Sequence, residues 1–185
     1  MIYALLDKES LLKRGLSLEN IAKKIELLNI PIAQYRNKLG TLKDKKEDLL
    51  IIKRYFSGKL IINDTIELIN FADGLHIGQD DIREFNSDLN ISIKVIRDKI
   101  GNKILGLSTH NYREIIEANS LDLEYIGLGA YRGTITKKDA KVLGDRALEL
   151  AKASKHPVGL IGGVKLNDTF GKEITYRVIG SDLYR

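Results

Sequence analysis

Short apolar runs alternate with longer amphipathic stretches along the whole chain. The apolar runs are rich in β-branched residues and have the length of strands buried on both faces. They predict eight strands, over residues 2–6, 30–35, 59–62, 74–77, 104–107, 123–128, 158–161 and 174–179. The stretches between them have the periodicity of helices with one apolar face. They predict helices over residues 18–28, 42–56, 66–71, 91–100, 112–118 and 140–153.

This alternation of strands and helices predicts one α/β domain over residues 1–185 with a parallel sheet. Eight strands favour a closed (β/α)8 TIM barrel over a doubly wound sheet, because no glycine-rich dinucleotide turn follows the first strand. Such barrels usually exceed about 200 residues. The chain begins at the first strand and stops soon after the eighth, so we expect a barrel shortened at its N-terminus and at its last helix.

The composition is that of an ordinary globular domain. Hydrophobic residues make up 43% of the chain and charged residues 30%, which suits one buried core. The absence of cysteine excludes disulfides and thiolate chemistry, and three scattered histidines argue against a zinc site. No stretch approaches the roughly 20 apolar residues of a membrane helix, and the first run reaches Asp7 too early for a signal peptide. We therefore expect a cytoplasmic protein without membrane contact.

The formal net charge of +5 raises the possibility of nucleic-acid binding. The lysine clusters, however, are interleaved with acidic residues, as in the segment 43–48, and aromatic residues are only 6% of the chain. This pattern is typical of a solvated helix face and offers no platform on which bases stack. We expect no nucleic-acid partner, and we attribute part of the positive charge to attraction for small phosphorylated molecules.

Polar side chains suited to phosphate follow the second predicted strand. Gln34, Arg36 and Lys38 alternate along the chain, so they lie on one side of the strand, at the interior and mouth of a barrel. Arginine offers a planar fork for phosphate oxygens, lysine a mobile charge, and glutamine a donor and an acceptor for the edge of a heterocycle. The alternative is an ordinary charged surface strand, which the apolar flanking residues disfavour.

Aspartates follow the next two strands. Asn63-Asp64 ends the most apolar run, and Asp80-Asp81 follows the fourth strand. Carboxylates at neighbouring strand ends suit Mg²⁺, which takes few protein oxygens and completes its shell with water and substrate phosphate. The alternative is that these aspartates cap the helices that follow. Beside two cations, the metal site is the better interpretation.

Hydroxyl groups and one histidine come after the fifth strand, and two other histidines lie elsewhere in the chain. Ser108 either donates to a phosphate or caps the helix that begins near residue 111. His76 and His110 are candidates for acid or base, but a single histidine in such a place is more often a packed, hydrogen-bonded residue. His156 precedes a proline at the opposite end of the barrel, so we expect no catalytic role for it.

Anion-binding loops are predicted after the last three strands. Thr134, Thr136 and Lys137 combine hydroxyls with a cation, although a threonine-lysine pair alone is a weak signal. Glycines stand where many barrels bind phosphate through backbone amides, in Gly162-Gly163 and in Gly180-Ser181. These glycines are alternatively explained by turn geometry alone.

The ordered motifs together resemble those of the thiamine phosphate synthase family. They are Gln-x-Arg-x-Lys at 34–38, Ile-Ile-Asn-Asp at 61–64, Ala-Asp-Gly-Leu-His-Ile-Gly-Gln-Asp-Asp at 72–81, Gly-Leu-Ser-Thr-His at 106–110, Thr-Ile-Thr-Lys at 134–137 and Ile-Gly-Gly at 161–163. The resemblance implies a (β/α)8 barrel that joins hydroxymethylpyrimidine diphosphate to thiazole phosphate and releases pyrophosphate. It implies a dissociative substitution assisted by Mg²⁺, in which no side chain acts as nucleophile.

The resemblance also assigns roles to residues. It implies that the diphosphate is held by Arg36, Lys38, Asn63, Ser108 and Lys137. It implies that Mg²⁺ is held by Asp64 and Asp81, and that the pyrimidine contacts Gln34. It implies that the thiazole phosphate is held by Thr134, Thr136, Gly163, Gly180 and Ser181. The chemistry would rest mainly on Arg36, Lys38, Ser108 and Lys137.

Some positions depart from the family pattern. Asn37 replaces a glutamate, and Gly129-Ala130 replaces a glycine-proline pair on the thiazole side. A sister group, the thiazole tautomerases, uses a histidine where Ala130 stands, so we rank a tautomerase-like isomerase second. A thiamine- or phosphate-binding barrel without turnover is the third hypothesis. A homodimer is possible, because a partner would cover the apolar end left by the missing helix.

Overall fold

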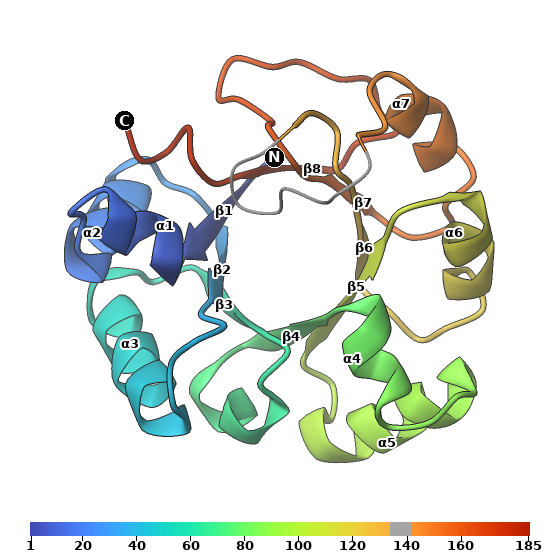
Figure 1. Ribbon diagram of the computed structural model, residues 1–185, viewed down its shortest axis with the longest axis horizontal. Helices are drawn as coiled ribbons and strands as arrows, with labels where there is room; N and C mark the ends of the chain where they lie inside the picture. The colour runs from blue at the N-terminus through green and yellow to red at the C-terminus, as the bar shows by residue number, and fades with distance from the viewer. Residues whose placement is uncertain (134–141) are drawn as a thin grey trace.

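The computed structural model describes residues 1–133 and 142–185, which form a closed barrel of parallel strands in the order β1 to β8 (Figure 1). This confirms the predicted (β/α)8 barrel. The strands are β1 (Ile2–Asp7), β2 (Ile32–Arg36), β3 (Lys59–Asn63), β4 (Gly74–Ile77), β5 (Ile104–Thr109), β6 (Tyr125–Leu128), β7 (Val158–Leu160) and β8 (Tyr176–Ile179). β1 pairs with both β2 and β8, which closes the barrel.

Helices surround the strands on the outside of the barrel (Figure 1). They are α1 (Lys8–Lys13), α2 (Leu18–Leu27), α3 (Leu42–Tyr55), the 3₁₀ helix η1 (Ile66–Phe71), α4 (Gln79–Arg83), α5 (Leu89–Ile100), α6 (Tyr112–Ala118) and α7 (Arg146–Ala151). Side-chain caps fix several helix starts: Ser17 accepts from the Asn20 amide, and Thr41 and Asp44 form a capping box at α3. β8 is followed by turns through residue 185.

The prediction of one long helix over residues 140–153 is wrong for the part that the structure describes. The segment 142–145 is not helical, and α7 is only six residues long. Gly144 has φ +55, which interrupts a helix, and the amides of Leu143 and Gly144 donate to the carbonyls of Ala130 and Tyr131. The segment therefore bonds to the loop after β6, a long-range contact that the amphipathic pattern does not encode. The sequence analysis also missed the short helix α1.

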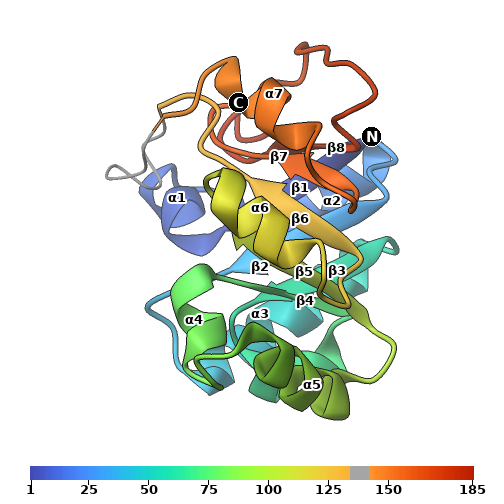
Figure 2. The same cartoon turned by 90° about the vertical axis from the view of Figure 1, so that its right-hand side faces the viewer.

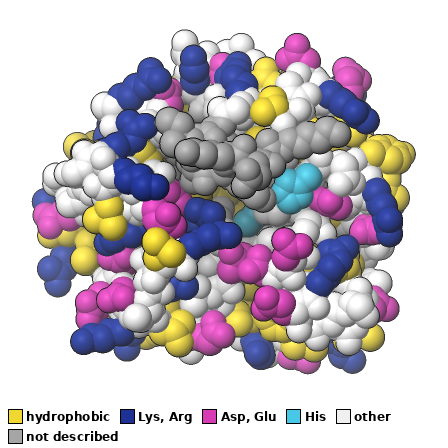
Figure 3. Space-filling model, viewed as in Figure 1, with side chains coloured by type: hydrophobic (Ala, Val, Ile, Leu, Met, Phe, Trp, Pro, Cys, Tyr) yellow, Lys and Arg dark blue, Asp and Glu magenta, His cyan; other side chains and the backbone are white. Residues whose placement is uncertain are grey.

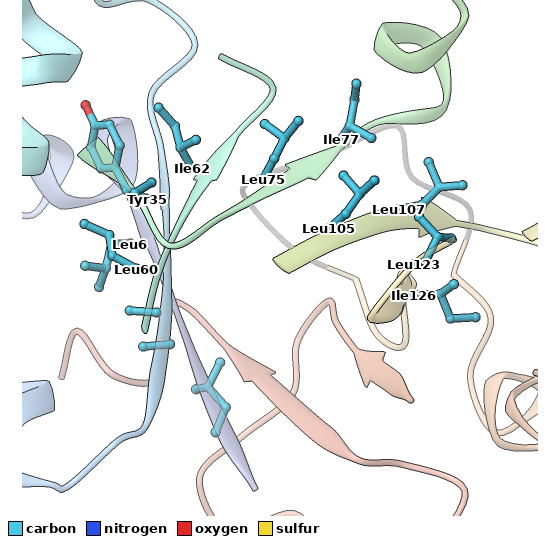
Figure 4. Close-up of a cluster of buried hydrophobic side chains, with 14 of the residues drawn as sticks. Leu6, Tyr35, Leu60, Ile62, Leu75, Ile77, Leu105, Leu107, Leu123 and Ile126 are labelled. Atoms are coloured by element: carbon cyan, nitrogen blue, oxygen red, sulfur yellow. The ribbon is translucent and has the colours of Figure 1, made fainter. Parts of the chain in front are cut away.

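Alternate residues of each strand face opposite sides of the barrel wall. Outward side chains pack against the helices in one large apolar cluster, part of which is shown in Figure 4; it includes Leu6, Tyr35, Leu60, Ile62, Leu75, Ile77, Leu105, Leu107 and Ile126. Inward side chains form a second, smaller cluster that contains Tyr3, Leu5, Ile32, Ile61, Tyr125 and Val178. Burying each outward leucine or isoleucine contributes about 1.5–3 kcal/mol, so the outer cluster provides most of the stability.

The carboxyl ends of the strands share one rim of the barrel. α1 and α4 follow directly from β1 and β4, and both lie at this rim, on the left of Figure 2. The register aligns Asp7 of β1 with Arg36 of β2, and Asn63 of β3 with His76 of β4. Polar residues from distant parts of the chain therefore reach the rim at similar heights. Among the described residues, no helix is long and apolar enough to cross a membrane.

Candidate functional site

A cavity of about 320 Å³ opens at this rim, and residues on or next to all eight strands line it. Ten of the predicted site residues are among its lining: Gln34, Arg36, Lys38, Asn63, Asp64, Asp81, Ser108, Gly163, Gly180 and Ser181. Thr134, Thr136 and Lys137 lie outside the described residues. In Figure 3, basic, acidic and histidine side chains meet near the centre of this face. The structure thus gathers residues spread over nearly 150 positions around one space.

The cationic side of the cavity contains Arg36 and Lys38. Arg36 Nη1 lies 2.5 Å from Oδ2 of Asp7, whose buried carboxylate also accepts from the amide and hydroxyl of Ser10. Asp7 holds the guanidinium in place, and among the described residues no other side chain occupies the remaining N–H groups of the fork. Within the described part of the chain, Lys38 has no ion-pair partner. The sequence analysis missed Asp7, although it follows a strand as the other site residues do.

The acidic side contains Asp64 and Asp81, which face the same small space beside Gly78. Asp64 Oδ1 accepts from the Gly78 amide at 3.1 Å, and Asn63 donates to Oδ2. A Cβ on Gly78 would collide with Asp81 Oδ2 and lie 3.8 Å from Asp64 Oδ1. Burial raises the pKa of Asp64, and the charge of Asp81 raises it further, against the opposing effects of Gly78 N–H, Lys38 and Arg36. Two carboxylates that repel each other in this way favour a bound cation.

Asp64, Asp81 and Ser108 do not cap the helices that follow them. Thr65 is the N-cap of η1 and Gly78 the N-cap of α4, and neither helix start has a side-chain cap. Asn111, not Ser108, caps α6. The described residues contain no cluster of three or more histidine or carboxylate side chains that could hold a metal. A pair of carboxylates suits Mg²⁺ bound together with a phosphorylated ligand.

Gln34 lies between the acidic pair and the barrel interior. Its Nε2 donates to Asn63 Oδ1 at 2.7 Å, and its Oε1 accepts from the Tyr3 hydroxyl at 3.2 Å. A glutamine amide has two N–H hydrogens and two carbonyl lone pairs. Among the described residues one of each has no partner, which suits a heterocycle edge that offers both an acceptor and a donor.

His76 forms part of the same interior. Its Nδ1 lies 2.9 Å from the Tyr125 hydroxyl, and its Nε2 lies 2.9 Å from Ser108 Oγ. Burial, with a smaller effect from His110, lowers the pKa of His76 to about 4, so the ring is neutral near neutral pH. The prediction that it is packed and hydrogen-bonded is confirmed. His110 also lines the cavity, and its Nδ1 lies 2.9 Å from Glu114 Oε2.

Glycines form the part of the rim after β7 and β8. Gly162 and Gly163 have φ of +91 and +65, a backbone conformation that favours glycine. A Cβ on Gly163 would lie 2.7 Å from Cβ of Arg132, whose guanidinium donates to the Gly163 carbonyl. Turn geometry therefore explains these glycines in part, and their position on the cavity wall is compatible with phosphate binding as well.

Comparison with known proteins identifies the family of this chain. The sequence model of the family described as thiamine monophosphate synthase matches residues 2–170. The chain belongs to the thiamine monophosphate synthase family. It is 37% identical over 169 residues to the thiamine-phosphate synthase of Methanosarcina mazei, covering 88% of this chain and 66% of that protein. It is 38% identical over 140 residues to that of Persephonella marina, covering 72% and 63%. The chain thus spans slightly less than two thirds of these relatives.

Solved structures show the same fold. The thiamine phosphate pyrophosphorylase of Pyrococcus furiosus superposes with a TM-score of 0.74 at 20% identity, covering 97% of this chain and 85% of that one. The (S)-3-O-geranylgeranylglyceryl phosphate synthase of Thermoplasma acidophilum, solved with sn-glycerol-1-phosphate, superposes with a TM-score of 0.65 at 12% identity. At these identities the likeness supports the barrel and not the chemistry.

Proposed function

We propose that this protein is a thiamine phosphate synthase that joins hydroxymethylpyrimidine diphosphate to thiazole phosphate and releases pyrophosphate. Membership of the family supports the reaction class. The observation that carries the proposal is the cavity itself, in which Arg36, Lys38 and the carboxylates of Asp64 and Asp81 lie around one space. A site with both charges suits a polyanion that arrives with a divalent cation.

We place the diphosphate on the cationic side of the cavity. Arg36, held by Asp7, offers paired donors, and Lys38 adds a mobile charge. Asp64 and Asp81 would hold Mg²⁺, which when bound neutralises charge on the diphosphate. The left-handed backbone of Asp64, with φ +57, is unusual for a residue other than glycine and supports a functional reason for its position.

Residues on or next to the other strands would contact the rest of the two substrates. Gln34 would contact the pyrimidine edge, and Asn63 and Ser108 would contribute to the diphosphate side. Gly163, Gly180 and Ser181 would hold the thiazole phosphate. The assignments of Lys137 to the diphosphate, and of Thr134 and Thr136 to the thiazole phosphate, rest on the motif resemblance alone.

The bond changes are those of a substitution that begins with loss of the leaving group. The bond between the pyrimidine methylene carbon and the diphosphate oxygen breaks, and its electron pair leaves with the diphosphate. Arg36 and Lys38 stabilise the charge that grows there, and Gln34 keeps the ring in place while it bears the positive charge. The thiazole nitrogen then donates its lone pair to the methylene carbon. No proton needs to be removed by a side chain.

The test is a pyrophosphate-release assay with both substrates, with each omitted in turn, and with a chelator. We expect release only with both substrates and Mg²⁺. Asp64→Ala should abolish it, while Asp98→Ala, at an exposed position of α5, should not. Undiminished turnover of Asp64→Ala would remove the metal role of Asp64. Isomerisation of a thiazole carboxylate phosphate without pyrophosphate release would instead support the tautomerase hypothesis.

A further inference from the structure

An unbroken chain of hydrogen bonds crosses the barrel interior from the acidic side to Ser108. It starts at Asp64 and passes through Asn63 and Gln34 to the Tyr3 hydroxyl. Tyr3 lies 2.8 Å from the Tyr125 hydroxyl, which lies 2.9 Å from His76 Nδ1. The last link joins His76 Nε2 to Ser108 Oγ. Both ends of the chain line the cavity, and its middle is buried among the strands.

The first half of this chain has only one possible direction. The carboxylate of Asp64 accepts and cannot donate, so the NH₂ of Asn63 faces it. Asn63 then presents its carbonyl to Gln34, whose NH₂ donates to it. The Gln34 carbonyl is left facing Tyr3, so the Tyr3 hydroxyl must donate its proton there.

The direction carries through the second half, because each hydroxyl has a single proton. The Tyr3 hydroxyl uses its single O–H to donate to Gln34, so the Tyr125 hydroxyl donates to Tyr3. Tyr125 must then accept from His76 Nδ1–H. The neutral ring of His76 has one N–H, so Nε2 is an acceptor and Ser108 donates to it. In the free protein the Ser108 hydroxyl therefore directs its proton to His76.

The barrel provides space for this chain. Gly106 on β5 stands where a Cβ would lie 2.6 Å from the Tyr125 hydroxyl and collide with its ring. Gly127 on β6 stands where a Cβ would lie 3.0 Å from the His76 ring. Burial raises the pKa of both Tyr3 and Tyr125, so both hydroxyls keep their protons. Water competes little for buried links of this kind, so the direction of one hydrogen bond sets the direction of the next.

We propose that Tyr3, Tyr125 and His76 act as positioning residues that couple the diphosphate side of the site to the pyrimidine side. The proposal rests on the proposed function for the identity of the two ligands. A phosphate oxygen only accepts hydrogen bonds. To bind it, Ser108 must turn its single O–H from His76 to the phosphate. His76 must then switch to its Nε2–H form and accept from Tyr125.

The switch reaches Gln34 through the two tyrosines. Once Tyr125 donates to His76, two arrangements are open to Tyr3. Either Tyr3 turns its O–H from Gln34 to Tyr125, or it keeps donating to Gln34 and the hydroxyl oxygens of Tyr3 and Tyr125 face each other without a proton between them. In the first case the hydrogen bond from Tyr3 to Gln34 is lost, and in the second case the hydrogen bond between Tyr3 and Tyr125 is lost. A net loss of one neutral hydrogen bond corresponds to about fivefold in affinity. The hydrogen bond from Tyr3 orients Gln34 for the pyrimidine, so its loss when pyrophosphate and Mg²⁺ bind should weaken the binding of the hydroxymethylpyrimidine alcohol by about fivefold, and the reverse.

The first test is ¹⁵N NMR of the His76 ring in the full chain. We expect the Nδ1–H form in the free protein and the Nε2–H form after addition of Mg²⁺ and inorganic pyrophosphate. In Ser108→Ala the added ligand should leave the Nδ1–H form in place. An Nε2–H ring in the free protein, or a ring that does not change when pyrophosphate binds to the wild type, would overturn the proposal.

The second test is calorimetric titration of the pyrimidine alcohol with and without Mg²⁺ and pyrophosphate. Tyr125→Phe should reduce the coupling to less than about twofold, and Tyr3→Phe offers a second break in the chain. Tyr176→Phe is the matched control, because its ring packs edge-on against both tyrosines at 5.9 Å but its hydroxyl is not a link. Coupling that persists in Tyr125→Phe refutes the proposal. Failure of both ligands to bind the wild type refutes the proposed function instead.

Discussion

Acidification should destabilise the protein through His76 in a way that can be isolated. The ring is buried and its pKa is lowered to about 4, while the same side chain in the unfolded chain has a pKa near 6.5. The unfolded state therefore takes up a proton at a higher pH than the folded state. The contribution of His76 to stability is fully present above pH 6.5, falls as the pH drops below that value, and levels off near pH 4.

The size of the effect follows from the two pKa values of His76. A difference of 6.5 to about 4 corresponds to about 3 kcal/mol when the titration is complete. Between about pH 7.5 and about pH 5, the linkage relation gives a loss of about 2 kcal/mol in the free energy of unfolding. Carboxylates elsewhere add their own dependence on pH, so the His76 contribution must be measured as a difference between variants.

The assay is urea unfolding of the wild type and of His76→Gln across this range of pH. The variant should be less stable near neutral pH, and the gap between the two proteins should narrow by about 2 kcal/mol on acidification. His156→Gln is the control, because His156 lies away from the cavity and bonds to the Ala118 carbonyl. If the wild type and His76→Gln lose stability in parallel, the ring is not held neutral by burial.

Two further predictions concern the charged walls of the cavity. Arg36→Ala leaves the buried carboxylate of Asp7 without its cation and should cost about 2–3 kcal/mol in unfolding free energy, whereas Lys38→Ala at an exposed position should cost less than about 0.5 kcal/mol. Both should lower kcat/KM for the diphosphate substrate, and equal stability losses in urea would contradict the pairing with Asp7. Gly78→Ala should push the carboxylate of Asp81 aside and raise the Mg²⁺ concentration for half-maximal activity by about tenfold, with little change in stability. An unchanged Mg²⁺ dependence would show that Asp81 is not a ligand.

The fold and part of the site were accessible from local patterns. Apolar runs of strand length predicted all eight strands, because a strand buried on both faces needs apolar residues at consecutive positions. The two-residue period placed Gln34 and Arg36 on the same side, and the structure has both on the cavity wall. These successes share one cause, which is that each depends only on residues close together in the sequence.

Other features depend on geometry that no local pattern contains. Asn63 and Asp64 are consecutive and would face opposite sides of a regular strand, but the left-handed backbone of Asp64 brings both to the cavity. The pairing of Asp7 with Arg36 depends on how β1 and β2 are staggered. Tyr3 and Tyr125 look like ordinary core aromatics in the sequence, and their contact across 122 positions appears only when the barrel closes.

The alternation of side chains across the barrel wall has a consequence for how such a protein can change over time. The outward side chains that attach the strands to the helices and the inward side chains that line the cavity occupy different positions of the same strands. Mutations at inward positions can therefore change the cavity while the contacts between strands and helices stay the same, and mutations at outward positions can change those contacts while the cavity stays the same. Selection for a stable scaffold and selection for a new substrate act on separate sets of residues.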